Sequence, residues 1–557
     1  MSSANSPMAA GTAARGHVRV ILAASLGTGF EWYDFFLYGS LAAVISRQFF
    51  TGLSETSGFI FALLTFAAGF AVRPFGALFF GRLGDLAGRK KTFLATIVIM
   101  GAATTLVGVL PNYQSIGIAA PITLIGLRML QGLAIGGEYG GAAIYVAEHA
   151  PPAERGRYTS WIQTTASLAL LLSLIVILVC RAVLGSAFET WGWRIPFLVS
   201  TVLLAVSVYI RLQLAESPVF QRMVAEGVRS TAPIRDAFGE RRNLKMILSV
   251  LFGATAGMNV VWYGGQLYAL FFLTQILKVE PQAANLLLAA VLVIATPLYL
   301  VFGRLSDRIG RKKVVLVGMA LAALTYFPIY RTLTHFANPA IEEAAQRAPV
   351  TVLAARGDCS LQFDPIGKKR FAGSCDVAKA ALAGAGVPYT TQIKPGGGIA
   401  LLRVGVGAGA SEVSSFDGAR LSPERFTAEH EAFLRSLRRA LTAAGYPTKA
   451  DPARISYPMV FLMLLILMVY VTAATGPMAA WLVELFPARV RYTSLSVPYH
   501  IGAGWFGGFL PAVAFTLVAI TGDIYSGIWY PVGVVTVTVL AGACLLPETA
   551  GRALRRA

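Results

Sequence analysis

Long apolar segments recur along the chain and predict its organisation. Each is about 20 residues or more, the length that an α-helix needs to cross a bilayer. Because lipid offers no hydrogen-bond partners to an open backbone, these segments are expected to be helices. Twelve of them are found, at residues 20–42, 59–80, 93–111, 119–147, 161–180, 195–214, 246–274, 285–303, 314–333, 458–481, 495–520 and 526–546.

One segment interrupts this pattern between the ninth and tenth helices. Residues 336–452 hold no long apolar run and are expected to form a soluble α/β insertion, with strands at 350–355 and 399–406 and helices at 376–385 and 422–444. An insertion after nine helices lies outside the cytoplasm if the N-terminus is cytoplasmic. A disulfide between Cys359 and Cys375 is therefore expected, with two unpaired thiols as the alternative.

The charge of the chain agrees with a membrane protein. The sequence is 56% hydrophobic and 13% charged, against about a quarter charged in soluble domains. A net charge of +19 could suggest a nucleic-acid partner. However, Lys and Arg gather in alternate loops, and the other short loops hold only Arg47, Arg181, Arg194 and Lys278. This bias predicts that both termini are cytoplasmic and that nucleic acid is not a partner.

Two strings of residues occur twice. Residues 81–91 (GRLGDLAGRKK) return at 303–313 as GRLSDRIGRKK, and residues 152–160 return one residue shorter at 487–494. The repeat predicts two six-helix halves, which is typical of transporters that rock around a central site. The expected divisions are a first half at 18–214, a cytoplasmic linker at 215–244, a second half at 245–335 and 453–547, and the insertion at 336–452.

The repeated G-R-L-x-D-x-x-G-R-K-K string resembles the signature of the major facilitator superfamily. EWYDFFLYG from Glu31, RPFG from Arg73, RMLQGLAIGGEY from Arg128 and WGWRIPF from Trp191 resemble its metabolite:proton symporter family. The resemblance implies an all-α membrane fold of twelve transmembrane helices in a bacterial inner (plasma) membrane. It also implies import of a small organic acid or zwitterion with protons. The large insertion departs from the family pattern.

The repeated strings are expected to form a cytoplasmic latch, because acid and base recur together in both halves and Gly permits close approach. In the first half the latch would join Asp85 and Arg89 to Glu148 and Arg157, and in the second it would join Asp307 and Arg311 to Glu484 and Arg491, with Gly81 and Gly88 at the turns. The alternative is that the basic residues only hold the loops inside.

Charges in the middle of the membrane are costly and usually functional or paired. They are Glu31, Asp34, Arg73, Arg128 and Glu138. Three acids face two bases, so one surplus acid could take up a proton. The helical rise places Glu31 level with Arg73. Similarity to sugar porters pairs Asp34 with Arg128, which we expect to be the proton-sensitive pair. Glu31 and Glu138 are the other coupling candidates, and static structural pairs are the alternative.

Candidate substrate contacts combine cations with aromatic and amide side chains. Arginine suits a carboxylate substrate, and a zwitterion is an equal option. In the second half Val261 and Gly264 align with Glu31 and Asp34, which confines proton chemistry to the first half. The candidates in the first half are Tyr33, Tyr38, Arg73, Arg128 and Gln131. Those in the second half, each of which could instead serve only packing, are Trp262, Tyr263, Gln266, Tyr268 and His500.

Other chemistry has no support in the sequence. The chain contains no Walker A string and no His/Cys spacing of a metal site, so neither ATP, a cofactor, a metal nor an enzymatic activity is expected. The expected partners are a small solute, protons and the lipid bilayer, and the expected functional unit is a monomer. Two alternatives stay open: an exporter or antiporter of the same fold, although residues 161–180 lack the Gly and Pro of drug antiporters, and a sensor that binds ligand through the insertion.

Overall fold

The computed structural model describes residues 28–29, 32–41, 44–50, 55–213, 216–228, 230–355, 357–360, 372–394, 398–552 and 554. Glu31 and most of the first half of the first expected span lie outside the described residues. Ten helices in the described part of the chain are long and apolar enough to cross a membrane, and they correspond to the third to twelfth expected spans. The second expected span lies within a helix whose first side chains are not described.

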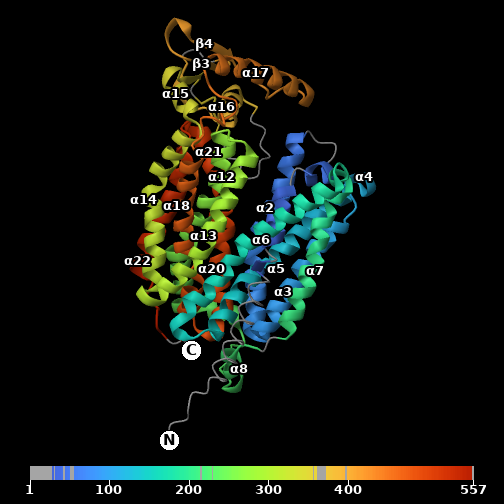
Figure 1. Cartoon of the computed structure of the whole chain (residues 1–557), viewed down its shortest axis with the longest axis vertical. Helices are drawn as coiled ribbons and strands as arrows, with labels where there is room; N and C mark the ends of the chain where they lie inside the picture. Colours follow the sequence, from blue (N-terminus) through green and yellow to red (C-terminus); the bar gives the residue numbers. More distant parts are fainter. Residues whose placement is uncertain are drawn as a thin grey trace.

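The first half of the chain forms one helical bundle, drawn in blue to cyan-green in Figure 1. Residues 32–41 and 44–49 are helical. The helices that follow are α2 (Glu55–Ala87), α3 (Arg89–Val109), the short α4 (Tyr113–Ile116), α5 (Ala119–His149), α6 (Arg155–Leu184) and α7 (Arg194–Leu212). The linker contains α8 (Pro218–Ala225) and α9 (Pro233–Gly239).

The second half forms a bundle beside the first (Figure 1). Its first span runs through α10 (Arg241–Val250), η3 (Leu251–Thr255), α11 (Ala256–Tyr263), η4 (Gly264–Tyr268), α12 (Ala269–Phe271) and η5 (Phe272–Ile276). The later helices are α13 (Pro281–Ile309), α14 (Arg311–Ala337), α18 (Tyr457–Thr475), α19 (Met478–Leu485), α20 (Arg491–Ile501), η8 (Gly502–Gly507), α21 (Leu510–Thr521) and α22 (Trp529–Leu545). The elements η3, η4, η5 and η8 are π-helical turns, which often occur at functional sites.

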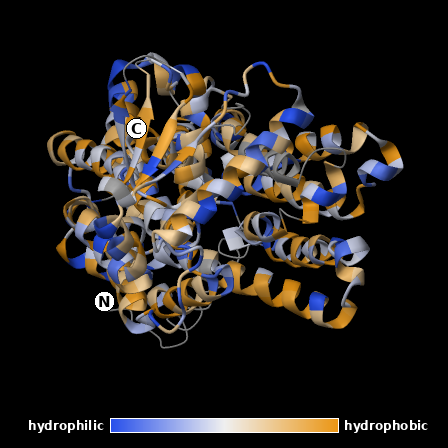
Figure 2. Ribbon diagram, turned by 90° about the horizontal axis from the view of Figure 1, so that it is seen from above, coloured by the Kyte–Doolittle hydropathy of each residue, from blue (hydrophilic) through white to orange (hydrophobic). Residues whose placement is uncertain are grey.

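Apolar side chains cover the outside of both bundles. Hydrophobic residues predominate along the helices at the rim of the molecule (Figure 2). Val183 and Leu324, for example, are exposed over 77% and 76% of their surfaces. A soluble protein would not expose such surfaces around its whole circumference, so the two bundles define a multi-pass membrane protein.

The insertion forms a small α/β unit at one end of the second bundle (Figure 1). It contains α15 (Pro339–Arg347), β1 (Val350–Ala354), α16 (Ser374–Ala385), β2 (Tyr389–Ile393), β3 (Leu401–Val404), β4 (Ser411–Ser414) and α17 (Pro423–Ala443). The strand order is β2-β1-β3-β4, with β1 parallel to β2 and the other pairs antiparallel. Apolar side chains of α16 and α17, such as Leu382 and Leu437, pack with Val352 and Leu402 of the sheet. A disulfide joins Cys359 to Cys375.

The two strands and two helices expected in the insertion are present, and β2, β4 and α15 were not expected. The residues of β2 after Tyr389 are exposed, so this strand lacks the alternation of apolar and polar positions that marks a half-buried strand. β4 spans only Ser411–Ser414 and has a single buried residue, Val413. Both strands lie at the edges of the sheet, where a short and polar sequence is common.

Glycines bring α2 and α5 into backbone contact. A methyl group added at Gly132 would collide with the carbonyl oxygen of Gly69, and one added at Gly136 would collide with that of Arg73. Small residues at four-residue spacing allow membrane helices to approach in this way. The contact fixes the height of Arg73 on α2 against the charged residues of α5.

Candidate functional site

Asp34 and Arg128 form a buried ion pair inside the first bundle. Arg128 Nη1 lies 2.7 Å from Asp34 Oδ2, and the two side chains are 5% and 2% exposed. Gln131 lies one helical turn further along α5, and its Nε2 donates to Asp34 Oδ1 at 3.2 Å and to Thr104 Oγ1 at 2.7 Å. Both carboxylate oxygens of Asp34 are therefore occupied by donors from a single helix face.

The Arg128 guanidinium has further donor groups that are not used in the pair with Asp34. It lies 3.8 Å from the centre of the Tyr38 ring. Its Nε and Nη2 atoms are buried and form no hydrogen bond with the residues that the structure describes, which is unfavourable for a charged donor unless a ligand or water satisfies it. Arg128 also lines a pocket, whose lining residues are Asp34, Phe35, Gly69, Phe70, Arg73, Arg128, Gln131, Gly132 and Ile135.

A second pocket lies between the two bundles and is rich in aromatic residues. It is lined by Trp32, Arg73, Tyr139, Gln163, Met258, Asn259, Trp262, Tyr263, Thr475, Tyr499 and Ala503. Two ring pairs cross from one bundle to the other here: the Trp32 and Trp262 centroids are 4.9 Å apart, and Tyr139 stacks on Tyr499 at 3.6 Å. Arg73 lines both pockets, with its guanidinium 4.2 Å from the Phe70 ring.

The expected substrate contacts divide into two groups. Arg73, Arg128, Gln131, Trp262 and Tyr263 line one or both pockets. The remaining five candidates are not among the lining residues, and they are Tyr33, Tyr38, Gln266, Tyr268 and His500.

Some residues of the second group have other partners. The Tyr33 hydroxyl donates to the Pro196 carbonyl at 2.8 Å. Tyr38 supports Arg128. His500 is buried, and neither ring nitrogen has a hydrogen-bond partner among the described residues.

Glu138 is neutralised by a partner that the sequence did not indicate. Its carboxylate accepts from Arg211 Nη2 at 2.6 Å and from Thr96 Oγ1 at 2.9 Å. Arg211 lies in the last turn of α7 and was not among the charges expected in the middle of the membrane. Its long side chain reaches back into the bundle and lies over the Phe93 ring. Arg211 is therefore a further buried base beside the two that the sequence indicated.

The first copy of the repeated string contacts the other half of the chain. Asp85 pairs with Arg89 at 2.7 Å. It also accepts from the backbone N–H groups of Tyr492 and Thr493 at 3.2 and 3.0 Å and from the Thr493 hydroxyl at 2.9 Å. Because these residues begin α20, the carboxylate lies at the positive end of a helix. Arg89 Nη2 donates to the Ala488 carbonyl at 2.8 Å.

The second copy repeats this arrangement in the opposite direction. Asp307 pairs with Arg311 at 2.5 Å and accepts from the backbone N–H groups of Gly156 and Arg157 at 2.9 Å each, in the first turn of α6. Gly81 and Gly303 allow these approaches, since a methyl group on Gly81 would lie 2.9 Å from the Thr493 Cα atom.

The other two acidic latch residues, Glu148 and Glu484, each have a partner in the other half of the chain, and Glu484 also has one in its own half. Glu148 pairs with Arg491 at 2.7 Å, and Glu484 pairs with Arg311 at 3.3 Å and with Arg155 at 3.4 Å. The expected pairing of Arg311 with Glu484 within the second half is present. Within the described residues of the first half, Asp85 and Arg89 form an ion pair with each other and not with Glu148. Arg157 has a half-exposed side chain that pairs with Glu154 at 3.4 Å. A sequence repeat cannot show whether equivalent contacts form within the halves or are exchanged between them.

Two glutamates in this network were missed. Glu216 accepts from the backbone N–H groups of Arg89 and Lys90, and Glu548 accepts from those of Arg311 and Lys312, at 2.8–3.2 Å. Each carboxylate satisfies the free N–H groups at the start of a helix. The signal was present in the sequence, because Glu-Ser at 216–217 and Glu-Thr at 548–549 follow the last span of each half.

Comparison with known proteins identifies the family. Residues 20–251 match the family described as "Sugar (and other) transporter". The chain is 35% identical over 320 residues to the "Proline/betaine transporter" of Escherichia coli (strain K12), covering 56% of this chain and 64% of that protein. It is 36% identical over 325 residues to the "Putative proline/betaine transporter" of Staphylococcus haemolyticus, covering 56% of this chain and 68% of that protein.

Solved structures share the fold. The proton:xylose symporter XylE of E. coli, bound to 6-bromo-6-deoxy-D-glucose, superposes with a TM-score of 0.61 at 15% identity, covering 97% of this chain and 98% of that chain. A second structure, of a D-xylose–proton symporter, gives a TM-score of 0.53 at 15% identity and covers 96% of this chain and 99% of that chain. Two helical bundles around a central pocket define a membrane transporter. The chain belongs to the major facilitator superfamily.

Proposed function

We propose that this protein imports a small zwitterionic or carboxylate solute together with protons. The match spans 64% of the E. coli relative, so the activity is inferred from the site as well as from the similarity. The observation that carries the proposal is the position of Arg73, which lines both the pocket of the Asp34–Arg128 pair and the aromatic pocket between the halves. A proton site and a solute site therefore share a cation.

The coupling would work through Arg128. While Asp34 is ionised, it neutralises Arg128 at 2.7 Å. Once Asp34 is protonated, the guanidinium regains its full attraction for an anionic group. A proton and a carboxylate would then favour each other's binding, and linkage requires the effect to be reciprocal.

The aromatic pocket favours a zwitterion within the wider class. Arg73 can hold a carboxylate. Trp32, Trp262, Tyr139, Tyr263 and Tyr499 offer several ring faces, and such faces attract a methylated or cyclic ammonium group. The relatives named as proline/betaine transporters agree with this chemistry.

The proposal includes a topology of twelve membrane helices in a bacterial inner membrane, with both termini cytoplasmic. The insertion would then lie on the opposite side. The disulfide between Cys359 and Cys375 supports this placement, because disulfides persist in oxidising compartments.

Uptake into liposomes tests the function. The purified chain is reconstituted, a pH gradient (acid outside) is imposed, and accumulation of labelled glycine betaine, proline and citrate is followed. We expect accumulation of at least one zwitterion and its loss when a protonophore is added. Efflux of solute against proton entry would instead show an antiporter. Binding without any transport would favour a sensor.

A further inference from the structure

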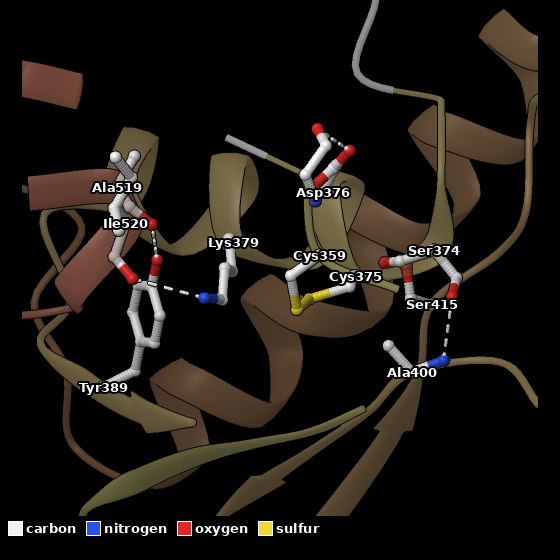
Figure 3. The surroundings of a disulfide bond; sticks show 11 residues. Cys359, Ser374, Cys375, Asp376, Lys379, Tyr389, Ala400, Ser415, Ala519 and Ile520 are labelled. Carbon is white, nitrogen blue, oxygen red and sulfur yellow. Dashed lines mark hydrogen bonds between the residues drawn. A yellow bond between two sulfur atoms is a disulfide. The ribbon is translucent and has the colours of Figure 1, made fainter. Parts of the chain in front are cut away.

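The insertion is fastened to the end of α21. Lys379 of α16 donates through Nζ to the Ile520 carbonyl at 3.2 Å, and the Tyr389 hydroxyl of β2 donates to the Ala519 carbonyl (Figure 3). The Tyr389 backbone N–H also donates to the Gly522 carbonyl at 2.9 Å. Lys379 thus places a positive charge on free carbonyls at the negative end of a membrane helix.

A second set of contacts joins the insertion to the residues that follow η5. Lys278 donates through Nζ to the Gly384 carbonyl, in the last turn of α16, at 2.7 Å. Its own carbonyl accepts from the Ala450 N–H at 2.9 Å, and the Leu277 carbonyl accepts from Asn338 Nδ2 at 2.9 Å. The two lysines are therefore reciprocal: one from the insertion caps a membrane helix, and one beside a membrane helix caps α16.

Backbone packing leaves no free space at either contact. Gly386 and Gly522 have φ angles of 71° and 79°, a conformation that glycine adopts readily. A methyl group on Gly386 would collide with the Ile276 carbonyl oxygen, and one on Gly522 would collide with the Tyr389 carbonyl oxygen. The insertion is therefore seated on both membrane segments through its main chain.

The helix α16 cannot shift separately from the rest of the insertion. Cys375, in the first turn of α16, is bonded to Cys359, which follows β1. Next to it, Ser374 accepts from the Ala400 N–H at 3.1 Å through its hydroxyl and from the Ser415 hydroxyl at 2.7 Å through its carbonyl (Figure 3). Any displacement of α16 must carry the sheet with it.

The two segments that the insertion joins belong to spans that line the aromatic pocket. The span ending at η5 contributes Trp262 and Tyr263, and the span ending at α21 contributes Tyr499 and Ala503. We propose that the insertion is a brace that holds the ends of η5 and α21 at a fixed separation and thereby sets the spacing of the pocket walls in the second half. The fixed separation does not depend on the proposed function. Only the effect of the brace on solute affinity rests on it.

Paired labels test the brace without any knowledge of the solute. Spin labels are attached at Gln275→Cys and Thr521→Cys, both exposed positions, in the full chain carrying Cys180→Ser and Cys544→Ser. They report the distance between the ends of η5 and α21. Gly386→Ala should broaden the distance distribution. Gly407→Ala is the matched control, because Gly407 has a similar φ of 69° and no atom within 4 Å of an added methyl group. An equally narrow distribution in both variants would overturn the brace.

A milder substitution guards against misfolding. Lys379→Met removes one cap without adding bulk, and Lys449→Met on the exposed surface of the insertion is its control. Losing a charged hydrogen bond should speed amide exchange around residues 519–523 roughly tenfold or more, with no change in the control. Unchanged exchange in a folded Lys379→Met protein would contradict the brace. If the distances respond but no solute is transported, the brace stands and the proposed function fails.

Discussion

Arg128 is the residue on which the proposed proton coupling depends, because three different groups set its state. Asp34 neutralises it, Tyr38 supports its flat face, and Gln131 holds the second oxygen of Asp34. Its two remaining donors have no hydrogen-bond partner in the described structure. A buried donor that lacks a partner is unfavourable by about 1–3 kcal/mol, so the site favours the arrival of an acceptor such as a carboxylate.

Asp34→Asn should separate proton coupling from solute binding. The amide keeps the shape of the side chain but mimics its protonated form permanently. We expect loss of uphill, pH-driven uptake with exchange of internal for external solute retained, whereas Arg128→Ala should lose binding itself. Uptake and exchange assays in the same liposomes give the comparison. If Asp34→Asn still accumulates solute under a pH gradient, Glu31 or Glu138 becomes the better candidate for the coupling site.

His430 makes the insertion sensitive to acid. Burial beside the Phe416 and Phe426 rings lowers the pKa of His430 below its ordinary value of 6.5, and the nearby Glu431 opposes this only in part. The folded state therefore binds fewer protons than the unfolded state as the pH falls below about 6.5. Stability from this residue is complete above that pH and is lost as the pH falls through the lowered pKa.

We therefore expect faster amide exchange in residues 411–446 at pH 5.5 than at pH 7.5, after correction for the intrinsic rates. His430→Phe keeps an aromatic ring at this position and should reduce that difference. An equal acid response in the variant would assign the effect to carboxylates elsewhere in the insertion.

Among the elements, α2 and α5 have the closest contact relevant to the site. Gly69, Gly76, Gly132 and Gly136 bring the two backbones together, and an added methyl group would collide at each of the last three positions. This contact sets Arg73 of α2 against Arg128 of α5 across one pocket. The spacing of two cations thus depends on residues that carry no charge.

Gly136→Leu should disrupt the pocket without touching a charged group. Overpacking a tight interface typically costs about 1–3 kcal/mol or more. We expect lower thermal stability and weaker solute binding, measured by a thermal shift with and without solute. Gly126→Leu is the control on the same helix, since no atom lies within 4 Å of a methyl group built there. Equal shifts in both variants would show that the α2–α5 contact tolerates separation.

The elements also show what the sequence could predict. Apolar runs indicated the spans, because hydrophobic length is a one-dimensional property, and the repeat indicated two similar halves. Side chains that cross between elements were harder to predict. Arg211 reaches Glu138 from a helix end, and Glu484 pairs with Arg155, a residue that the sequence did not indicate. Such choices depend on how helices face each other, which neither spacing nor depth along one helix reveals.

At the scale of the whole molecule, the two halves are held together by reciprocal caps at the end remote from the insertion. Asp85 of the first half caps α20 of the second, and Asp307 of the second half caps α6 of the first. Glu148–Arg491 and Glu484–Arg155 add ion pairs that cross the same contact. In the proposed topology this end is cytoplasmic, so the structure has the cytoplasmic side closed. In the proposed transport cycle these contacts would break and re-form.

Asp85→Asn should therefore shift the protein toward the state in which this side is open. Asparagine can still accept the two hydrogen bonds that Thr493 donates to a single oxygen, but it loses the one from Tyr492. It also leaves the fully buried Arg89 without its ion-pair partner. Hydrogen bonds to charged groups contribute about 1.5–3 kcal/mol, which is tenfold or more in the ratio of open to closed states. Opening should become easier and closing harder, so net uptake should slow.

A reporter cysteine can measure that shift directly. Ser496 is fully buried on α20 against Gly140 of α5, between the latch and Tyr499 of the aromatic pocket. In a background of Cys180→Ser and Cys544→Ser, alkylation at Ser496→Cys by a maleimide from the latch side reports opening of the contact. Asp85→Asn should speed this alkylation roughly tenfold or more. Arg157→Gln is the control, because its half-exposed guanidinium pairs only with Glu154 among the ion pairs described, and it should leave the rate unchanged. The opposite result would be a faster rate in Arg157→Gln and an unchanged rate in Asp85→Asn. It would support the latch within each half that the sequence alone suggested.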